Sequence, residues 1–238
     1  MSPIPDHETA PFENLDLMAP SSSATMMKRS PTMIRANSPS NIADKRTPKD
    51  PTVSAVMQHL RRIGIQLLAF DFDQTIIDIH TGGNWDGSAE ELIPHIRPIM
   101  YQLIQAAVAT KTTVADGSSM EVAIVTFSGQ TDLIENVMDH IVGGAPGAKR
   151  NIPVYGAYCC SQYHGPGSTD GKQAHISRTI QELSRVAGTK FQKSTTVLID
   201  DDRNNVKYAE LDSTRAVWFH PEEPGLLLLQ ELLRLTPL

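Results

Sequence analysis

The chain has 238 residues, of which 40% are hydrophobic and 20% charged, enough apolar material for one substantial core plus an appendage. Asp and Glu (27) outnumber Lys and Arg (21), and the resulting formal charge of −6 argues against nucleic-acid binding through a broad basic surface. The only two cysteines, Cys159 and Cys160, are adjacent, which excludes a disulfide framework and favours a reducing compartment. No apolar run is long enough to span a membrane, and the acidic N-terminus is unlike a secretory signal, so we expect a cytoplasmic protein.

Residues 1–52 differ in composition from the rest of the chain. They hold eight of the sixteen prolines and twelve Ser or Thr, with six basic and six acidic residues that cancel. Such a segment buries too little apolar surface to offset the entropy of ordering it. We therefore predict a disordered tail over residues 1–52 and a single folded domain over residues 53–238.

From residue 53 onward, helical and strand patterns alternate. Apolar residues at helical spacing predict a helix from residue 53 that ends at Gly64, and further helices over residues 99–109, from Lys172 to about Ala187, and 225–235. Leu133, Val137, Met138 and Ile141 form one apolar stripe at helical spacing, and Ile176, Ile180, Leu183 and Val186 form another within the helix that begins at Lys172. Short apolar runs predict buried strands over residues 65–70, 122–127, 152–158, 195–199 and 215–219. This order predicts a doubly wound α/β fold, a parallel sheet of about five strands with helices on both faces.

Carboxylates follow two of these strands. Asp71 and Asp73 end the first strand two residues apart, so an extended backbone would place them on one side. Asp200, Asp201 and Asp202 end the fourth. Ligands of such sheets bind at the carboxyl ends of the strands, and an all-oxygen site there suits Mg²⁺. The pattern alone does not decide which of these three carboxylates would bind the metal, and Asp202 is also suited to capping the next helix.

Hydroxyl groups and one lysine complete the candidate site. Thr126 and Ser128 follow the second strand, where they are suited to hydrogen-bonding a phosphoryl oxygen together with backbone N–H groups. Lys172 opens a predicted helix, a position that is unfavourable for the helix dipole. A lysine retained there is suited to offsetting carboxylate or phosphate charge, and Asp170 is the expected N-cap.

These residues, taken in order, resemble the four motifs of the haloacid dehalogenase (HAD) superfamily: Asp71-Phe72-Asp73-Gln74-Thr75, then Thr126, then Lys172, then Val197-Leu198-Ile199-Asp200-Asp201. The resemblance implies that Asp71 is a nucleophile that forms an aspartyl-phosphate, and that Asp73 is the acid and base. It also implies that Thr126 and Lys172 bind the phosphoryl oxygens, with Lys172 also steadying Asp71, and we add Ser128 to this phosphate-binding set from its position after the second strand. Mg²⁺ would lie between Asp71, the Asp73 backbone carbonyl and Asp200, which alignment with the fourth motif makes the first candidate of its triplet, with Asp201 as the second. An Asp two residues after the nucleophile favours a phosphomonoester phosphatase over a dehalogenase.

Two other readings of this pattern remain open. A chain of the same fold without turnover would serve as a binding or scaffold protein, and a phosphotransferase would pass the phosphoryl group to an acceptor other than water. The expected partner is a phosphorylated small molecule or phosphoprotein, with no membrane surface and no nucleic acid, and an oligomer is compatible with the sequence.

The spacing between motifs leaves no room for a large cap domain. Only 52 residues separate Asp73 from Thr126, and 45 separate Thr126 from Lys172. We predict an open site with a small irregular flap over residues 78–98. Within it, His80 or Trp85 either contacts the leaving group or belongs to a glycine-rich turn with a packing Trp, and the sequence favours neither.

Overall fold

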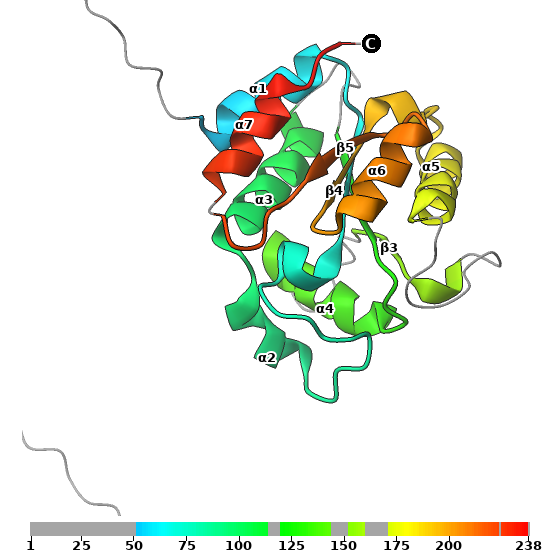
Figure 1. Ribbon diagram of the computed structural model, residues 1–238. Coiled ribbons are helices and arrows are strands. Elements are labelled where there is room, and N and C mark those ends of the chain that lie inside the picture. The colour runs from blue at the N-terminus through cyan, green and yellow to red at the C-terminus, as the bar shows by residue number, and fades with distance from the viewer. Residues whose placement is uncertain (1–50, 114–119, 144–151, 160–170, 224, 238) are drawn as a thin grey trace, which may run out of the picture. The chain divides into compact units, whose positions relative to one another are not determined.

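The computed structural model describes residues 51–113, 120–143, 152–159, 171–223 and 225–237 (Figure 1). The contacts of the chain divide it into two units, Met1–Arg46 and Thr47–Leu238, and the first lies outside these ranges. The predicted disordered tail, apart from its last two residues, therefore also lies outside the described residues. Thr52, which closes that tail, caps the first helix by accepting a hydrogen bond of 3.2 Å from the Ala55 N–H.

The described residues form one parallel sheet of five strands, as the sequence predicted. The strands are β1 (Leu67–Phe70), β2 (Glu121–Val125), β3 (Val154–Tyr155), β4 (Thr196–Asp200) and β5 (Arg215–Trp218), in the spatial order β3-β2-β1-β4-β5. The chain builds outward from β1 through β2 to β3 and then crosses to β4 on the other side. This reversal beside β1 is the topological switch point at which such sheets bind ligands.

Seven α-helices accompany the sheet in the described part of the chain. They are α1 (Val53–Arg62), α2 (Ala89–Leu92), α3 (Pro98–Thr113), α4 (Thr131–Val142), α5 (Gln173–Ala187), α6 (Arg203–Leu211) and α7 (Leu226–Arg234). Each predicted helix is present, although α3 is longer than expected and α2 was not predicted. Ser88 and Glu91 form a capping box around α2, a signal that was visible in the sequence. None of these helices is long and apolar enough to cross a membrane.

Alternate side chains of the central strands point into two separate apolar cores. Leu68 and Phe70 of β1 pack with α1, α3, α4 and α7, whereas Leu67 and Ala69 pack on the opposite face with α5 and α6. Figure 1 shows the same division, with α5 and α6 on one side of the sheet. Because both faces are covered, β1 is fully buried, which explains its continuous apolar run.

The third strand and the apolar stripe of α5 are both shorter in the structure than the sequence predicted. The third strand was expected over residues 152–158 but covers only Val154–Tyr155. The chain leaves the sheet at Gly156, where a Cβ atom would lie 2.4 Å from the Ser128 carbonyl oxygen, and the Ala157 N–H bonds that oxygen at 2.9 Å. On α5, Val186 is 73% exposed, so the predicted apolar stripe does not extend to the end of the helix.

No cap domain lies between β1 and α3. The segment over residues 78–98, which we call the flap, contains only α2 and the short turn η2 (Ile93–His95). Its base is closed by an antiparallel bridge between Ile77 and Ile96 and by a bond of 2.9 Å from the Asp78 N–H to the His95 carbonyl. The prediction of a small flap in place of a cap is confirmed for this part of the chain.

Candidate active site

The carboxyl end of β1 places Asp71 in a pocket of about 420 Å³. Phe70 pairs with Ile199 of β4, and the Asp71 N–H donates to the Ile199 carbonyl at 2.9 Å. This register sets Asp71 beside Asp200, the residue after Ile199. Beyond Asp71 the chain leaves the sheet in the turn η1 (Phe72–Ile76), where Gln74 has a left-handed φ of 57°.

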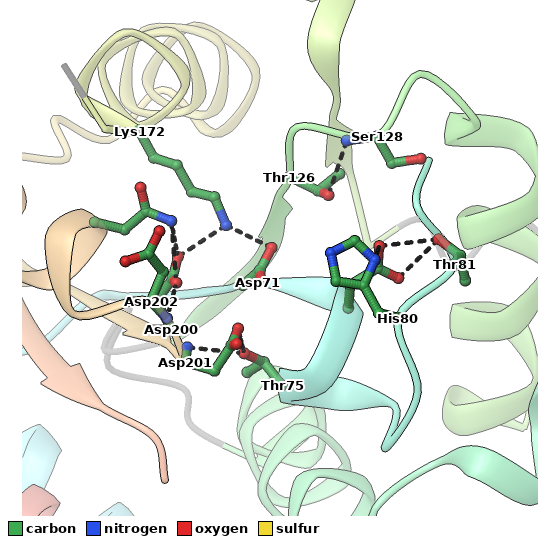
Figure 2. Close-up of polar contacts among 12 residues, drawn as sticks. Asp71, Thr75, His80, Thr81, Thr126, Ser128, Lys172, Asp200, Asp201 and Asp202 are labelled. Carbon is green, nitrogen blue, oxygen red and sulfur yellow. Dashed lines mark hydrogen bonds and ion pairs between the residues drawn. The ribbon is translucent and has the colours of Figure 1, made fainter. Parts of the chain in front are cut away.

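Lys172 is an ammonium group buried among carboxylates. It lies at the start of α5, is 2% exposed, and donates to Asp200 Oδ2 at 2.8 Å while forming an ion pair with Asp71 (Figure 2). Burial alone would lower the pKa of Lys172, but Asp200 and then Asp71 more than offset this and raise it above its ordinary value. Lys172 therefore stays charged and holds the ends of β1 and β4 together. The predicted cap, Asp170, lies outside the described residues, and Lys172 itself occupies the N-cap position.

Asp200 is held by donors on both carboxylate oxygens. Its Oδ1 accepts from the Asp202 N–H at 2.9 Å and from the Asn205 side-chain amide at 3.1 Å, and its Oδ2 accepts from Lys172. Our sequence reasoning missed Asn205. The signal was present, because a helix capped by Asp202 places Asn205 in its first turn, next to the end of β4.

Asp201 is anchored to the first motif. Its Oδ1 accepts from the Thr75 hydroxyl at 3.0 Å, and its N–H donates back to Thr75 Oγ1 at 3.1 Å. Burial, and next the neighbouring Asp200, raise the pKa of Asp201. Asp202 takes the expected capping role, accepting from the Asn204 N–H at 2.7 Å at the start of α6.

Asp71, Asp200 and Asp201 bring oxygen atoms within 4.8 Å of one another. Burial raises the pKa of Asp71 well above its usual range, the charge of Lys172 opposes this rise, and Asp200 adds to it. The cluster thus carries more negative charge than one lysine offsets. Hard oxygen donors with excess negative charge fit Mg²⁺. The metal ligands predicted from the sequence (Asp71, Asp73, Asp200 and Asp201) nevertheless remain a prediction, and the Asp73 carboxylate lies outside this group.

Two buried hydroxyl groups follow β2 and line the pocket. Thr126 Oγ1 accepts from the Ser128 N–H at 3.1 Å, and Ser128 Oγ accepts from the Gln130 N–H at 3.1 Å. A hydroxyl has one proton to donate and two lone pairs. Because each oxygen already accepts a backbone N–H, its own proton remains for an anionic oxygen in the pocket.

Figure 2 shows His80 and Thr81 of the flap on the opposite side of Asp71 from Asp200, and both residues lie next to Asp73. The Thr81 hydroxyl lies 2.8 and 2.9 Å from the two carboxylate oxygens of Asp73, and His80 Nδ1 lies 3.5 Å from Oδ2 (Figure 2). His80 Nδ1 accepts from the Gly82 N–H at 2.8 Å. The sequence did not single out Thr81, which no periodic pattern connects to Asp73.

The flap is also fastened to the start of α4. The Gln130 side chain accepts from the Trp85 N–H at 2.6 Å and donates to the Trp85 carbonyl at 2.8 Å. The Trp85 ring packs against the larger core and does not line the pocket, whereas His80 does. Of the two readings left open, His80 thus fits the pocket-facing role and Trp85 the packing role.

No protein-family model matches the chain, and no curated protein matches it. Several solved structures are similar to it at low identity. The N-terminal part of the protein BF1531 from Bacteroides fragilis, containing a phosphatase domain complexed with Mg, is 10% identical with a TM-score of 0.45. That match covers 76% of this chain and 43% of the other, so the chain spans less than half of its length.

Two further similar structures have HAD in their descriptions. The HAD domain of effector protein Lem4 from Legionella pneumophila is 14% identical with a TM-score of 0.41, covering 70% of this chain and 91% of that one. A HAD family enzyme from Bacteroides thetaiotaomicron is 12% identical with a TM-score of 0.36, covering 69% of this chain and 98% of that one. HAD proteins, the superfamily whose ordered motifs the sequence resembles, are thus among the solved structures similar to this chain.

Proposed function

We propose that this chain is a HAD-type hydrolase, specifically a Mg²⁺-dependent phosphomonoester phosphatase that acts through an aspartyl-phosphate on Asp71. The observation that carries the proposal is the buried Lys172 ammonium between Asp71 and Asp200. A buried cation that contacts the candidate nucleophile opposes the rise in its pKa and orients the carboxylate for attack, and both effects favour covalent catalysis.

In the first half-reaction, an Asp71 oxygen attacks phosphorus and the bond from phosphorus to the leaving-group oxygen breaks. Asp73 in its acid form gives its proton to that departing oxygen. The hydroxyl groups of Thr126 and Ser128 donate hydrogen bonds to the phosphoryl oxygens, and Lys172 keeps Asp71 in place. In the second half-reaction, Asp73 takes a proton from water, the water oxygen attacks phosphorus, and the bond to Asp71 breaks. Phosphate leaves and Asp71 is restored as a carboxylate.

Asp71 and Asp201 are the carboxylates best suited to hold the ion. Asp200 directs its oxygens at Lys172, Asn205 and the Asp202 N–H, whereas Asp201 accepts from Thr75 through Oδ1. When bound, Mg²⁺ would neutralise charge on the transferring phosphoryl group. Within this division of roles, Asp200 acts mainly by holding Lys172.

The test is hydrolysis of 4-nitrophenyl phosphate by the full chain with Mg²⁺, with excess EDTA, and after Mg²⁺ is restored. We expect activity with Mg²⁺, loss on chelation and recovery on readdition. Asp71→Asn should lower kcat by about a thousandfold or more, because an amide is not a competent nucleophile. Asp139→Asn makes the same change on an exposed face of α4 away from the pocket and should leave kcat unchanged. Full activity in EDTA would contradict the metal requirement, and normal turnover by Asp71→Asn would exclude this nucleophile.

A further inference from the structure

The pocket is strongly acidic for a site that receives a phosphate ester. Among the described residues that line it, four carry carboxylates and one carries an ammonium group: Asp71, Asp73, Asp201, Asp202 and Lys172. Asp200 is fully buried, forms an ion pair with Lys172 and adds another carboxylate next to the pocket. A phosphoryl dianion entering this pocket already meets an excess of negative charge.

The ammonium group that lines the pocket is already paired with carboxylates at the reacting centre. Lys172 is paired with Asp71 and Asp200. Arg203 follows Asp202 directly, but its guanidinium lies 3.8 Å from the centre of the Trp218 ring, and Arg203 is not among the lining residues. Apart from His80, which is a cation only when protonated and lies 3.5 Å from Asp73, the described lining residues therefore offer no second cation to an anionic group on the leaving-group side.

A bound Mg²⁺ would not reverse this balance. If Asp73 is protonated in its acid role, the carboxylates of Asp71, Asp200, Asp201 and Asp202 still outnumber the combined positive charge of Lys172 and one divalent ion. Charges a few ångströms from each other in a partly enclosed pocket interact appreciably, because solvent screens them less than on an open surface. The excess negative charge of the pocket therefore acts on the leaving group of the substrate.

We propose, on the basis of the function proposed above, that the substrates are phosphomonoesters whose leaving group is neutral or cationic. A second anionic group on the substrate, such as a carboxylate or another phosphate, is selected against. Asp202 is the residue that sets this preference, because it is exposed, lines the pocket and is the lining carboxylate to which no catalytic step is assigned.

Asp202 can be neutralised without disturbing the helix that it starts. Its carboxylate accepts from the Asn204 N–H at 2.7 Å as the N-cap of α6, and Asn is as good an N-cap residue as Asp. Asp202→Asn therefore removes one charge from the pocket while keeping the cap. Glu210→Gln removes the same charge from an exposed position near the other end of α6, away from the pocket, and is the matched control.

The experiment compares three aryl phosphates that carry an aminomethyl, a hydroxymethyl or a carboxymethyl group at the para position. The methylene insulates the ring, so that leaving-group acidity stays similar while the charge changes from positive through zero to negative. With the full chain, Mg²⁺ and low salt, we expect kcat/KM to fall by about tenfold or more from the ammonium to the carboxylate substrate. Added salt should screen these charges and lower the ratio of the two kcat/KM values toward one.

The Asp202→Asn variant should reduce that ratio by about three- to fivefold, and Glu210→Gln by less than about twofold. The corresponding non-hydrolysable benzylphosphonates should inhibit in the same order, which reports binding without turnover. Hydrolysis of all three esters with the carboxylate equal or preferred would overturn this inference and leave the proposed function standing. An unchanged ratio in Asp202→Asn would overturn the role of Asp202, and no turnover of any ester would overturn the proposed function itself.

Discussion

Asp71 and Lys172 lie where regular elements end or begin, whereas His80 and Thr81 belong to an irregular flap on the other side of the same pocket. The first pair is buried, and its backbone is fixed by the register of β1 with β4 and by the start of α5. Near the pocket, the flap is held by side-chain hydrogen bonds, those of Thr81 to Asp73 and of Gln130 to Trp85. Because Asp71 and Lys172 are buried charges, changes to them should affect the free energy of unfolding as well as catalysis. Changes to the flap should mainly affect how Asp73 is oriented.

The largest effect should come from removing the charge at the centre of the buried cluster. Lys172→Met leaves Asp71 and Asp200 facing each other without their cation, so we expect the free energy of unfolding to fall by about 3–5 kcal/mol. Urea unfolding at neutral pH measures this loss. Added Mg²⁺ should restore part of it, because the acidic cluster would gain a positive charge.

Lys193→Met is the matched control for this prediction. Lys193 pairs with Asp212 at 2.5 Å, but both side chains are about one-third exposed, so its loss should cost less than about 1 kcal/mol. Equal losses for the two variants would contradict the claim that burial distinguishes Lys172.

The second prediction concerns His175, which lies on α5 with its ring centre 5.4 Å from that of Phe127. Burial, and next the charge of Lys172, lower its pKa to about 4, and a bond to the Gly156 backbone opposes the shift. The unfolded state, with an ordinary imidazole pKa of about 6.5, binds more protons between these values. Stability therefore falls as the pH drops through this window, by about 2 kcal/mol between pH 7 and pH 4.5.

The contribution of His175 to this loss of stability is measured by comparing the free energy of unfolding of the native chain with that of His175→Gln at pH 7 and at pH 4.5. Asp71 and Asp201 have raised pKa values and contribute stability in the opposite direction as the pH falls, but they do so in both chains. The difference between the two chains should therefore shrink or reverse at pH 4.5. A difference that stays constant with pH would show that His175 is not held neutral.

The same contrast between regions explains what could be predicted from the sequence. Asp71, Thr126 and Asp200 follow apolar runs, and a strand end is a place that hydrophobicity locates to within a residue or two. Lys172 was found because its charge conflicts with the helix start. Strand β3 was overestimated because its apolar run continues past Gly156, where close approach to Ser128 turns the chain away. Thr81 and Gln130 act through contacts between segments 8 and 45 residues apart, which leave no local pattern.

The smallest predicted effect tests whether the flap orients the acid. Thr81→Val keeps the shape of the side chain but removes the hydroxyl that contacts both oxygens of Asp73. We expect kcat/KM to fall about tenfold for an alkyl phosphate, whose leaving group needs a proton, and little for 4-nitrophenyl phosphate, whose leaving group departs as an anion. Thr81→Ser restores the hydroxyl and should recover the alkyl phosphate rate.

The Thr81→Val variant should have little effect on stability. Because the lost hydrogen bonds lie at a partly exposed site, the free energy of unfolding should change by less than about 1.5 kcal/mol in this variant. An equal loss on both substrates, without rescue by serine, would mean that Thr81 shapes the flap in general; a selective and rescued loss would make it the residue that aims Asp73 at the departing oxygen.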